Sequence, residues 1–358
     1  MNAPLTIGLD LGGSKLAAGL VDASGTVLAV GHRPVRGADY DDALDAIVAL
    51  VGRLQGDSGE AGGGAVGVGV AAAAFLDADR TRIVHAANLG WHDRPLRGDL
   101  ENRLELPVTL VNDADAAAWG EYVHGAGRGQ SSIVLITLGT GVGSGIVIDG
   151  QLVCGAHGVG GELGHMPVVV DGRPCVCGGR GCLEQYASAT ALRRAAQEGA
   201  RARPNAARRL LGLAGDVEAV DGRHIVAAAR AGDPVALAAF DEVGRWLGVA
   251  VAHVVALLDP ALVLIGGGLV AAGELILAPA SAGYSRHTGM PNLRPTPPLH
   301  RARLGANAGV VGAAALARPH AEADRDARAA PGAAQANRSA SDAKHSNPSD
   351  TVAGMGAA

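Results

Sequence analysis

The chain has 358 residues, enough for two domains of ordinary size, and 48% of them are hydrophobic. Only 3% are aromatic and the formal net charge is −5, so the chain lacks the basic surface and the stacking rings typical of nucleic-acid-binding proteins. Four cysteines in a chain of this length are too few for a scaffold held together by disulfides.

The chain shows no pattern typical of export or of membrane insertion. The N-terminal residues MNAPLTIGLDLGGSK lead into a strand-like run without a charged leader or a signal-type apolar stretch. The longest apolar stretch, residues 246–268, is interrupted by His253, Asp259 and Pro260. It therefore predicts a buried helix followed by a buried strand. We expect a soluble, cytoplasmic protein with no membrane or nucleic-acid partner.

Two segments of the chain follow the same plan of strand, glycine-rich turn and returning strand. They are residues 7–30, which contain DLGGSK, and residues 134–153, which contain LGTG. The bend of such a hairpin presents backbone amides that suit a phosphate. The repetition predicts two related half-domains, each with one phosphate-sized nest. The alternative is two unrelated hairpins in a glycine-rich chain.

The remaining patterns predict strands that alternate with helices. Residues 41–55 have helical periodicity, residues 65–77 predict a buried strand, and residues 106–127 predict a strand that runs into a helix. Asn112 or Asp113 stands where that helix begins, a position favoured for capping.

Further along the chain, three more helices are expected before a core strand that opens onto three glycines. The expected helices are residues 188–202, 223–231 and 233–258. Strands that alternate with helices indicate an α/β fold. From residue 318 the composition changes to Ala, Asp, Ser, Pro and Arg, which predicts a disordered tail over residues 318–358.

One histidine and three cysteines within a short stretch suggest a metal site. They are His165, Cys175, Cys177 and Cys182. This set suits tetrahedral zinc, and four protein ligands would make the site structural, with no open position for a substrate. The C-x-C spacing is poor for a disulfide and lacks the C-x-x-C separation of a thioredoxin-like pair. The fourth cysteine, Cys154, is expected to be a small buried hydrophobic residue.

Two glutamates, Glu162 and Glu184, lie beside the expected metal ligands. An ion at this place would hold both carboxylates at fixed positions, as outer-shell groups hold ligands. Fixed carboxylates suit hydrogen bonds to the vicinal hydroxyls of a sugar. The alternative is that both glutamates are surface or helix-capping groups.

Asn112 and Asp113 follow a buried strand, at the edge of the sheet where α/β folds bind ligands. Asp113 could accept a proton from an attacking hydroxyl, and Asn112 could orient that hydroxyl. An Asn-Asp pair before a helix is often only a cap. Asp115 is expected to be a first-turn acid that interacts with the helix dipole.

The two glycine-rich turns, residues 10–15 and 138–141, are neither a Walker A loop nor a Rossmann fingerprint, because each bends between two strands. Asp10 is placed to hold Mg²⁺ through water, and Ser14 and Thr140 supply hydroxyl donors. Lys15 could reach a phosphate, although a position on the hairpin surface is favoured.

Five motifs in this order resemble those of the ROK (repressor, ORF, kinase) sugar kinases, and most of all the actinobacterial glucokinases. The motifs are DLGGSK, NDADAAAWGE, LGTGVGSGIV, GELGH and CVCGGRGCLEQY. The resemblance covers about residues 5–317. It implies an actin-like ATPase fold of two ribonuclease-H-like domains around a nucleotide and sugar cleft. The expected division is residues 1–113, completed by a C-terminal helix at about 305–317, and residues 114–304 with the zinc site.

The resemblance also implies roles for individual residues, carried over position by position. Asp113 matches the catalytic base. The sugar contacts match Asn88, Asn112, Asp113, Glu162, His165 and Glu184. The ATP-binding positions match Asp10, Gly12, Gly13, Ser14, Lys15, Gly139, Thr140, Gly141, Gly266, Gly267 and Gly268. His165, Cys175, Cys177 and Cys182 match the zinc ligands.

Three positions depart from the family pattern. Ser14 replaces a threonine and keeps the hydroxyl. Asp115 replaces an asparagine, so an added negative charge could raise the pKa of the base. Ala74 replaces a glycine whose backbone meets the sugar, and its methyl group could crowd the sugar or shift the loop. The family's repressors carry a winged helix-turn-helix before the first phosphate loop, where about six residues stand here, so a kinase is favoured over a transcription factor.

The predicted function is ATP-dependent phosphorylation of a hexose at its 6-hydroxyl, with glucose as the favoured substrate and Mg²⁺ accompanying ATP. The alternatives are a kinase for N-acetylmannosamine, N-acetylglucosamine, mannose or fructose, or a sugar-sensing regulator without catalysis. Because relatives are dimers or tetramers, we expect a homodimer or a homotetramer.

Overall fold

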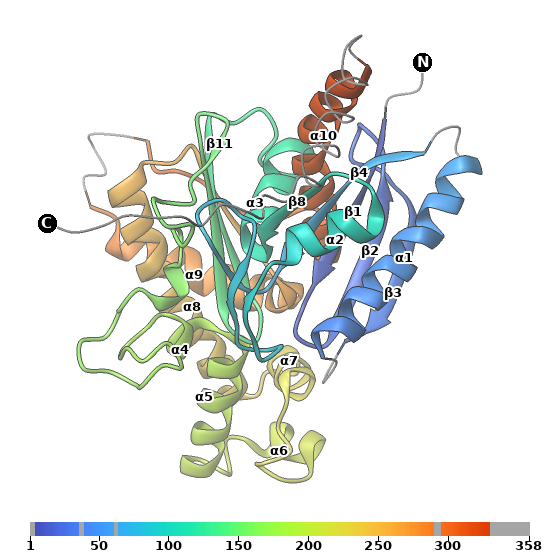
Figure 1. The fold of residues 1–358 in the computed structure, drawn as a ribbon. Helices are drawn as coiled ribbons and strands as arrows, with labels where there is room; N and C mark the ends of the chain where they lie inside the picture. Colours follow the sequence, from blue (N-terminus) through green and yellow to red (C-terminus); the bar gives the residue numbers. More distant parts are fainter. Residues whose placement is uncertain (1–3, 36–38, 61–63, 290–294, 330–358) are drawn as a thin grey trace, which may run out of the picture.

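The computed structural model describes residues 4–35, 39–60, 64–289 and 295–329 (Figure 1). Two five-stranded sheets stand side by side, and the first contains only strands from before residue 113. In spatial order these strands are β3 (Val27–Pro34), β2 (Lys15–Val21), β1 (Leu5–Leu11), β4 (Ala65–Ala72) and β8 (Val108–Asn112). The sheet is mixed, because β1 pairs antiparallel with β2 and parallel with β4.

Helices cover both faces of the first sheet. Side chains alternate along β1, so that Ile7 and Leu9 enter the same core as α1 (Tyr40–Glu60) while Gly8 faces α10 (Ala308–Ala329). Helix α2 (Leu96–Leu104) packs against α1 and β8.

The second sheet repeats the hairpin of the first and is also mixed. In spatial order its strands are β11 (Gln151–Leu152), β10 (Val142–Ile148), β9 (Ser132–Leu138), β12 (Leu262–Gly266) and β13 (Leu299–Arg301). The antiparallel pair β9–β10 matches the pair β1–β2, which confirms the predicted hairpin repeat. The α/β class is confirmed as well, while the exact domain boundaries stay a prediction.

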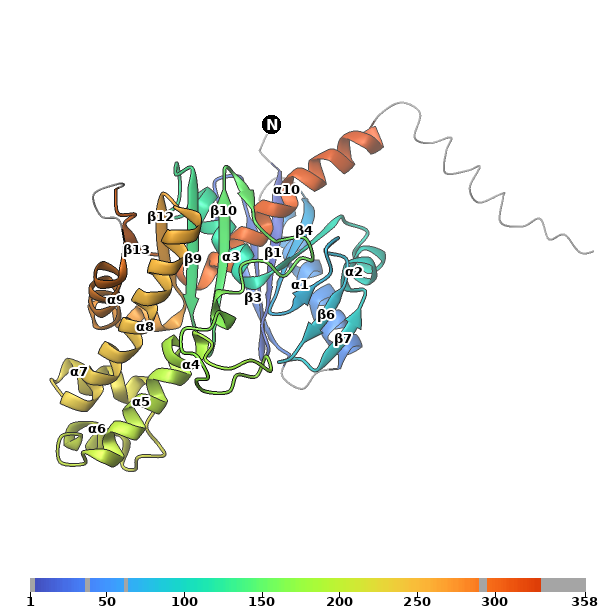
Figure 2. The same cartoon turned by 90° about the vertical axis from the view of Figure 1, so that its left-hand side faces the viewer.

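Most helices of the second half pack on or beyond this second sheet. Their bounds are α3 (Asp113–His124), α4 (Glu184–Ala187), α5 (Ala189–Ala202), α6 (Arg208–Ala214), α7 (Gly222–Arg230), α8 (Pro234–Leu258) and α9 (Glu274–His287). Helices α5, α6 and α7 lie together at one end of the molecule (Figure 2). Three of these helices lie where the periodicity predicts them, namely α5, α7 and α8.

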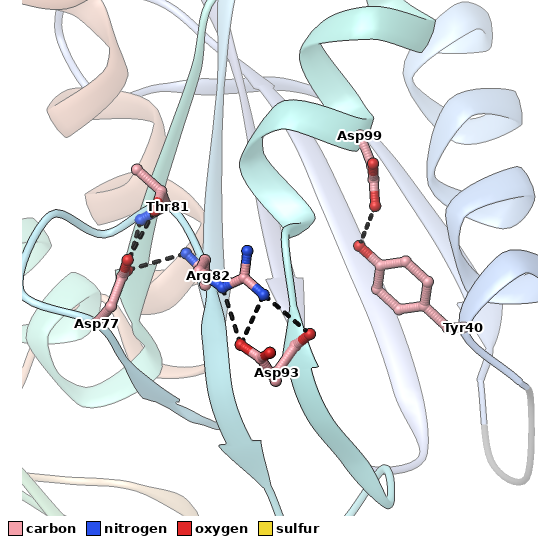
Figure 3. A network of polar contacts seen from close by, with 6 residues as sticks. All are labelled: Tyr40, Asp77, Thr81, Arg82, Asp93 and Asp99. Carbon is pink, nitrogen blue, oxygen red and sulfur yellow. Dashed lines mark hydrogen bonds and ion pairs between the residues drawn. The ribbon is translucent and has the colours of Figure 1, made fainter. Parts of the chain in front are cut away.

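A third, small sheet was not predicted from the sequence. It consists of β5 (Phe75–Leu76), β6 (Ile83–Ala86) and β7 (Trp91–Arg94), strands too short to show a clear alternation. The turn before β6 is held by the Asp77 carboxylate, and Arg82 pairs with Asp93 across the sheet at 2.6 Å (Figure 3). Nearby, Tyr40 donates to Asp99 at 2.8 Å and so ties α1 to α2.

The prediction of a disordered tail is wrong for residues 318–329, which continue helix α10 to Ala329. The helix continues because alanine, arginine and glutamate in this stretch favour it. The Arg318 side chain also anchors it, donating to the Thr6 hydroxyl at 3.1 Å and to the Asp22 carbonyl at 2.8 Å. Residues 330–358 lie outside the described residues.

Helices in the described part of the chain include none with the length and apolar character needed to cross a bilayer. Two short 3-10 turns, Leu163–His165 and Gly268–Ala272, stand between the larger elements and carry residues of the expected site.

Glycines let helix α10 approach its neighbours closely. A Cβ atom at Gly8 or at Gly69 would overlap a carbonyl oxygen of α10, and one at Gly312 would overlap the Ala116 carbonyl oxygen of α3. Since α10 touches both the first sheet and α3, it joins the two halves of the molecule.

Gly312→Ala is expected to destabilise the protein by more than about 2 kcal/mol, because the added methyl forces backbone apart in a packed interface. The matched control is Gly52→Ala, at a helical glycine whose Cβ would meet nothing within 4 Å. It should raise stability slightly, by up to about 1 kcal/mol. Chemical unfolding of the two variants measures the difference, and equal effects would contradict the close-packing account.

Candidate functional site

The site is a cleft made of adjoining cavities between the two sheets. The first has a volume of about 390 Å³. Ten of the residues predicted to bind sugar or nucleotide line this cavity. They are Asn88, Asn112, Asp113, Gly139, Thr140, Gly141, Glu162, His165, Glu184 and Gly267. A hexose fits a cavity of this size and polarity.

The second cavity adjoins the first and shares the Asp113 side chain with it. It is about 300 Å³ in volume and is also lined by Asp10, Gly266 and Gly267. A third cavity, of about 770 Å³, is more apolar and is lined by Gly139, Thr140, Gly268 and residues of α7. The first cavity shares Asp113 with the second, and Gly139 and Thr140 with the third.

Asp113 is the first residue of α3 and lies half-buried at the bottom of the cleft. Burial raises the pKa of this carboxyl to about 7, and the negative charges of Asp10 and Glu162 add to the effect. A carboxyl with a pKa near neutrality is suited to accept a proton.

Asn112 has a structural role that its position predicts. Its Oδ1 accepts the backbone N–H groups of Ala114 at 2.9 Å and Asp115 at 3.2 Å, so it caps α3. Its Nδ2 donates to the Ala74 carbonyl oxygen at 3.3 Å. Asn112 thereby fixes Asp113 relative to the loop that forms the opposite wall.

The four expected metal ligands are brought together. The Nδ1 atom of His165 and the three cysteine Sγ atoms all lie within 4.8 Å of one another. Sγ of Cys177 and Sγ of Cys182 are 3.7 Å apart, and Nδ1 of His165 lies 3.6 Å from Sγ of Cys175. Tetrahedral zinc with bonds of about 2.3 Å to sulfur and about 2.0 Å to nitrogen gives edges of about 3.8 Å and 3.6 Å. The donor set and its spacing therefore fit a tetrahedral metal ion.

The two glutamates connect this cluster to the cleft. Glu184 begins α4, and its Oε1 lies 3.7 Å from Sγ of Cys175 while its Oε2 accepts the Val142 N–H at 3.3 Å. Glu162 immediately precedes the 3-10 turn that carries His165. Burial raises the pKa of Glu162, and the charge of Glu184 adds to this, while His165 opposes it. Neither carboxylate is a plain surface group.

The LGTG turn forms a wall shared by the first and third cavities. Gly139 donates its backbone N–H to the Gly141 carbonyl at 2.9 Å, which closes the turn. A Cβ at Gly141 would overlap Glu184, so the turn and the carboxylate are packed together. Gly267 packs directly on this turn, since a Cβ there would lie 2.4 Å from the Leu138 carbonyl oxygen, and its φ of +82° is one that glycine adopts without strain.

In the DLGGSK turn, Asp10 lines the second cavity, while residues 11–15 line none of these three cavities. Ser14 and Lys15 are exposed at its tip, as the surface alternative for Lys15 predicts. Burial raises the pKa of Asp10, while Lys15 opposes this shift. Gly13 packs so closely on Asn88 that a Cβ there would come within 2.4 Å of the Asn88 Cβ. The turn therefore contacts Asn88, which lines the first cavity.

Ala74 is almost completely buried, at 8% exposure, and its side chain belongs to the wall of the first cavity. Its backbone φ is not in the left-handed region, so alanine is accommodated without strain there.

Several lining residues were not predicted from the sequence, and three of them are polar residues of the first cavity. Thr137, at the carboxyl end of β9, lines the first two cavities, and this position at a strand end was the signal that could have indicated it. His85 lines the first cavity from the unpredicted small sheet. Ser144 accepts the Leu163 N–H at 3.1 Å and also hydrogen-bonds the Gly161 carbonyl, which holds the segment that carries Glu162.

The prediction that Cys154 is a buried hydrophobic residue is wrong. Its thiol is half-buried and lies between two charged groups, 2.7 Å from the Arg80 guanidinium and 3.4 Å from Oδ2 of Asp115. Burial raises the pKa of this thiol to about 11. Asp115 does lie in the first turn of α3, but its carboxylate contacts this thiol as well.

The arrangement combines a sugar-sized polar cavity, a half-buried carboxyl of raised pKa and glycine turns that present backbone amides. A carboxylate at the junction of two cavities can accept a proton from a hydroxyl bound in one while an electrophile is held in the other. Such a site is suited to the transfer of a group from one bound molecule to another.

Comparison with known proteins agrees with this geometry. Residues 6–320 match the ROK family. The glucokinase of Streptomyces coelicolor is 43% identical over 315 residues, which cover 88% of this chain and 98% of that protein. The solved ROK family glucokinase from Streptomyces griseus, in complex with glucose and AMPPNP, is 44% identical with a TM-score of 0.79 and covers 88% of this chain and 99% of that one. The ROK hexokinase from Thermus thermophilus is 34% identical with a TM-score of 0.75, over 89% and 99% of the two chains. The chain therefore belongs to the ROK family.

Proposed function

We propose that this protein transfers the γ-phosphoryl group of ATP to the 6-hydroxyl of glucose. The observation that carries the proposal is the place of Asp113, whose carboxyl faces both a sugar-sized cavity and the cavity lined by Asp10 and Gly267. The glucokinase relatives, one of them solved with glucose and an ATP analogue, support the choice of substrates.

In the proposed reaction, the sugar occupies the first cavity. Its ring hydroxyls donate to the carboxylates of Glu162 and Glu184. They also contact Asn88 and Nδ2 of Asn112, whose Oδ1 caps α3. Because Nδ1 of His165 faces the cysteine sulfurs, Nε2 remains to contact a hydroxyl. Several fixed partners on one ring orient the 6-hydroxyl toward Asp113.

Asp113 then accepts the proton of the 6-hydroxyl as the oxygen attacks the γ-phosphorus, and ADP departs in line. The second and third cavities receive the nucleotide, with the backbone amides of the glycine turns directed at the phosphates. Mg²⁺ bound with ATP would neutralise phosphate charge, and Asp10 would hold it through water. We infer that the two halves have the actin-like arrangement and close on the substrates, which excludes water.

We assign His165, Cys175, Cys177 and Cys182 to a structural zinc ion, whose four bonds would hold the segments of Glu162 and Glu184 in place. All four positions are taken by protein atoms, so the ion would supply rigidity and take no part in the transfer.

Asp113→Asn is expected to lower kcat by about 10²–10⁴, the usual range for a positioned base, with glucose binding nearly unchanged. Coupled ADP release measures turnover, and calorimetric titration measures binding. Near-normal turnover would contradict the role of Asp113.

The same variant has an internal control for folding. The folded state raises the pKa of Asp113 above its ordinary value, so ionisation of this group destabilises the fold increasingly as pH rises toward 7. Asp113→Asn should therefore unfold at a temperature equal to or above that of the wild type at pH 8.

The dependence of catalysis on pH follows from the same group. Because the carboxylate is the active form, kcat/KM for glucose at saturating ATP and Mg²⁺ should rise with pH and level off above an apparent pKa of about 7. Glucose does not titrate in this range. A profile that is flat between about pH 5.5 and 8.5 would contradict the raised pKa of the base.

Removal of the metal tests the zinc assignment. Purified protein is expected to contain one zinc ion per chain by elemental analysis, and Cys177→Ala, at the exposed ligand, should lose it. The KM for glucose should then rise more than the KM for ATP, because the glutamates lose their support. Metal-free protein with an unchanged KM for glucose would contradict this role.

A further inference from the structure

Three side chains from distant parts of the chain meet near the first cavity. Arg80 comes from the turn before β6, Cys154 follows β11 of the second sheet, and Asp115 lies in the first turn of α3. Arg80 Nη2 lies 2.7 Å from Sγ of Cys154, which in turn lies 3.4 Å from Oδ2 of Asp115. We call these three residues the clasp. None of them has a part in the proposed phosphoryl transfer.

The three groups of the clasp form a chain in which each donor meets an acceptor. The guanidinium of Arg80 donates to sulfur, and the thiol of Cys154 donates to the Asp115 carboxylate. The raised pKa of Cys154 keeps it in the thiol form that this chain of donors needs. Asp115 is 5% exposed, and its pKa of about 6 reflects burial, which the thiol and Arg80 oppose. Its carboxylate is therefore a buried charge with Arg80 as its nearby counter-charge.

The clasp joins two segments that lead to lining residues of the first cavity. The Arg80 turn directly follows Ala74 and Phe75, and the segment after Cys154 leads to Glu162. The two segments are packed tightly, because a Cβ at Gly158 would lie 2.9 Å from the Asp77 carbonyl oxygen. Asp77 itself accepts N–H groups from Thr81 and Arg82, which makes the turn rigid (Figure 3). Asp115 is two residues from Asp113.

We propose that Arg80 is a positioning residue for the sugar. Arg80 neutralises the charge of Asp115 through Cys154. It thereby holds the two segments that the clasp joins at the separation that glucose needs in the first cavity. The proposal rests on the proposed function, since it takes glucose as the occupant of that cavity. It assigns no contact with the substrate to Arg80.

Arg80→Ala is expected to raise the KM for glucose, and the Kd of glucose measured by calorimetry, at least about tenfold. The KM for ATP should stay within about twofold, because residues 73–82 and 154–162, the segments that the clasp joins, supply no residue to the second or third cavity. Turnover at saturating glucose should remain close to that of the wild type. A purely structural defect would instead lower kcat and change both KM values.

The chain offers matched controls. Arg82→Ala removes another arginine of the same turn, whose ion pair with Asp93 is on the surface, and it should leave both KM values unchanged. Asp115→Asn removes the buried charge while its amide oxygen still accepts from the thiol, so it should resemble the wild type. The double variant Arg80→Ala/Asp115→Asn should recover most of the glucose affinity, within about threefold of the wild type, because no unpaired charge remains.

Several results would overturn the proposal. They are a wild-type KM for glucose in Arg80→Ala, equal changes in both KM values, or a double variant as impaired as Arg80→Ala alone. If Arg80→Ala does not fold, Cys154→Ala provides the second test, since it breaks the chain of donors and should shift the KM for glucose in the same direction. Failure of the proposed function is distinguishable, because wild-type protein would then neither phosphorylate nor bind glucose.

Discussion

In the proposed site, a metal ion bound by His165, Cys175, Cys177 and Cys182 is the constraint on which the sugar-binding carboxylates depend. The segment that carries it, residues 153–183, has one 3-10 turn as its only helix, although Leu163, Met166 and Val168 pack against the core. A long segment with little regular structure loses much conformational entropy when it is ordered. Four ligand atoms within 4.8 Å of one another provide a single point to which the segment is tied. A metal ion bound there would hold the carboxylates of Glu162 and Glu184 in place.

Asp113, the proposed base, lies in surroundings that destabilise its charge. Asp113 lies where burial and the charges of Asp10 and Glu162 disfavour its ionised form, which costs stability at neutral pH. The fold offsets this cost with close packing nearby, since α10 meets the first sheet and α3 through glycines that allow backbone contact. Asn112 caps α3 through Oδ1 and donates from Nδ2 to the Ala74 carbonyl, so it connects the start of α3 to the loop at Ala74. Because its surroundings are rigid, the Asp113 carboxyl keeps both its buried environment, which raises its pKa, and its orientation.

Much of this architecture was predictable from the sequence, for reasons that differ between elements. The paired hairpins β1–β2 and β9–β10 were predictable because buried alternation and glycine turns are local signals. The metal cluster was predictable because ligand type and spacing carry its chemistry. The small sheet β5–β6–β7 was not, because its strands are two to four residues long and are held by contacts such as Arg82 with Asp93. The environment of Cys154 was not predictable either, since Arg80 and Asp115 reach it from distant segments. Residues 318–329 were misjudged because composition alone hides the anchoring of Arg318.

The most direct test of this account is a crystal structure with glucose and a nonhydrolysable ATP analogue, with diffraction data collected on both sides of the zinc absorption edge. The account predicts an anomalous peak between Nδ1 of His165 and the three cysteine sulfurs, and a glucose ring held by Glu162 and Glu184 with its 6-hydroxyl on the Asp113 carboxylate. An empty cluster beside well-ordered glucose, or a 6-hydroxyl directed away from Asp113, would contradict it.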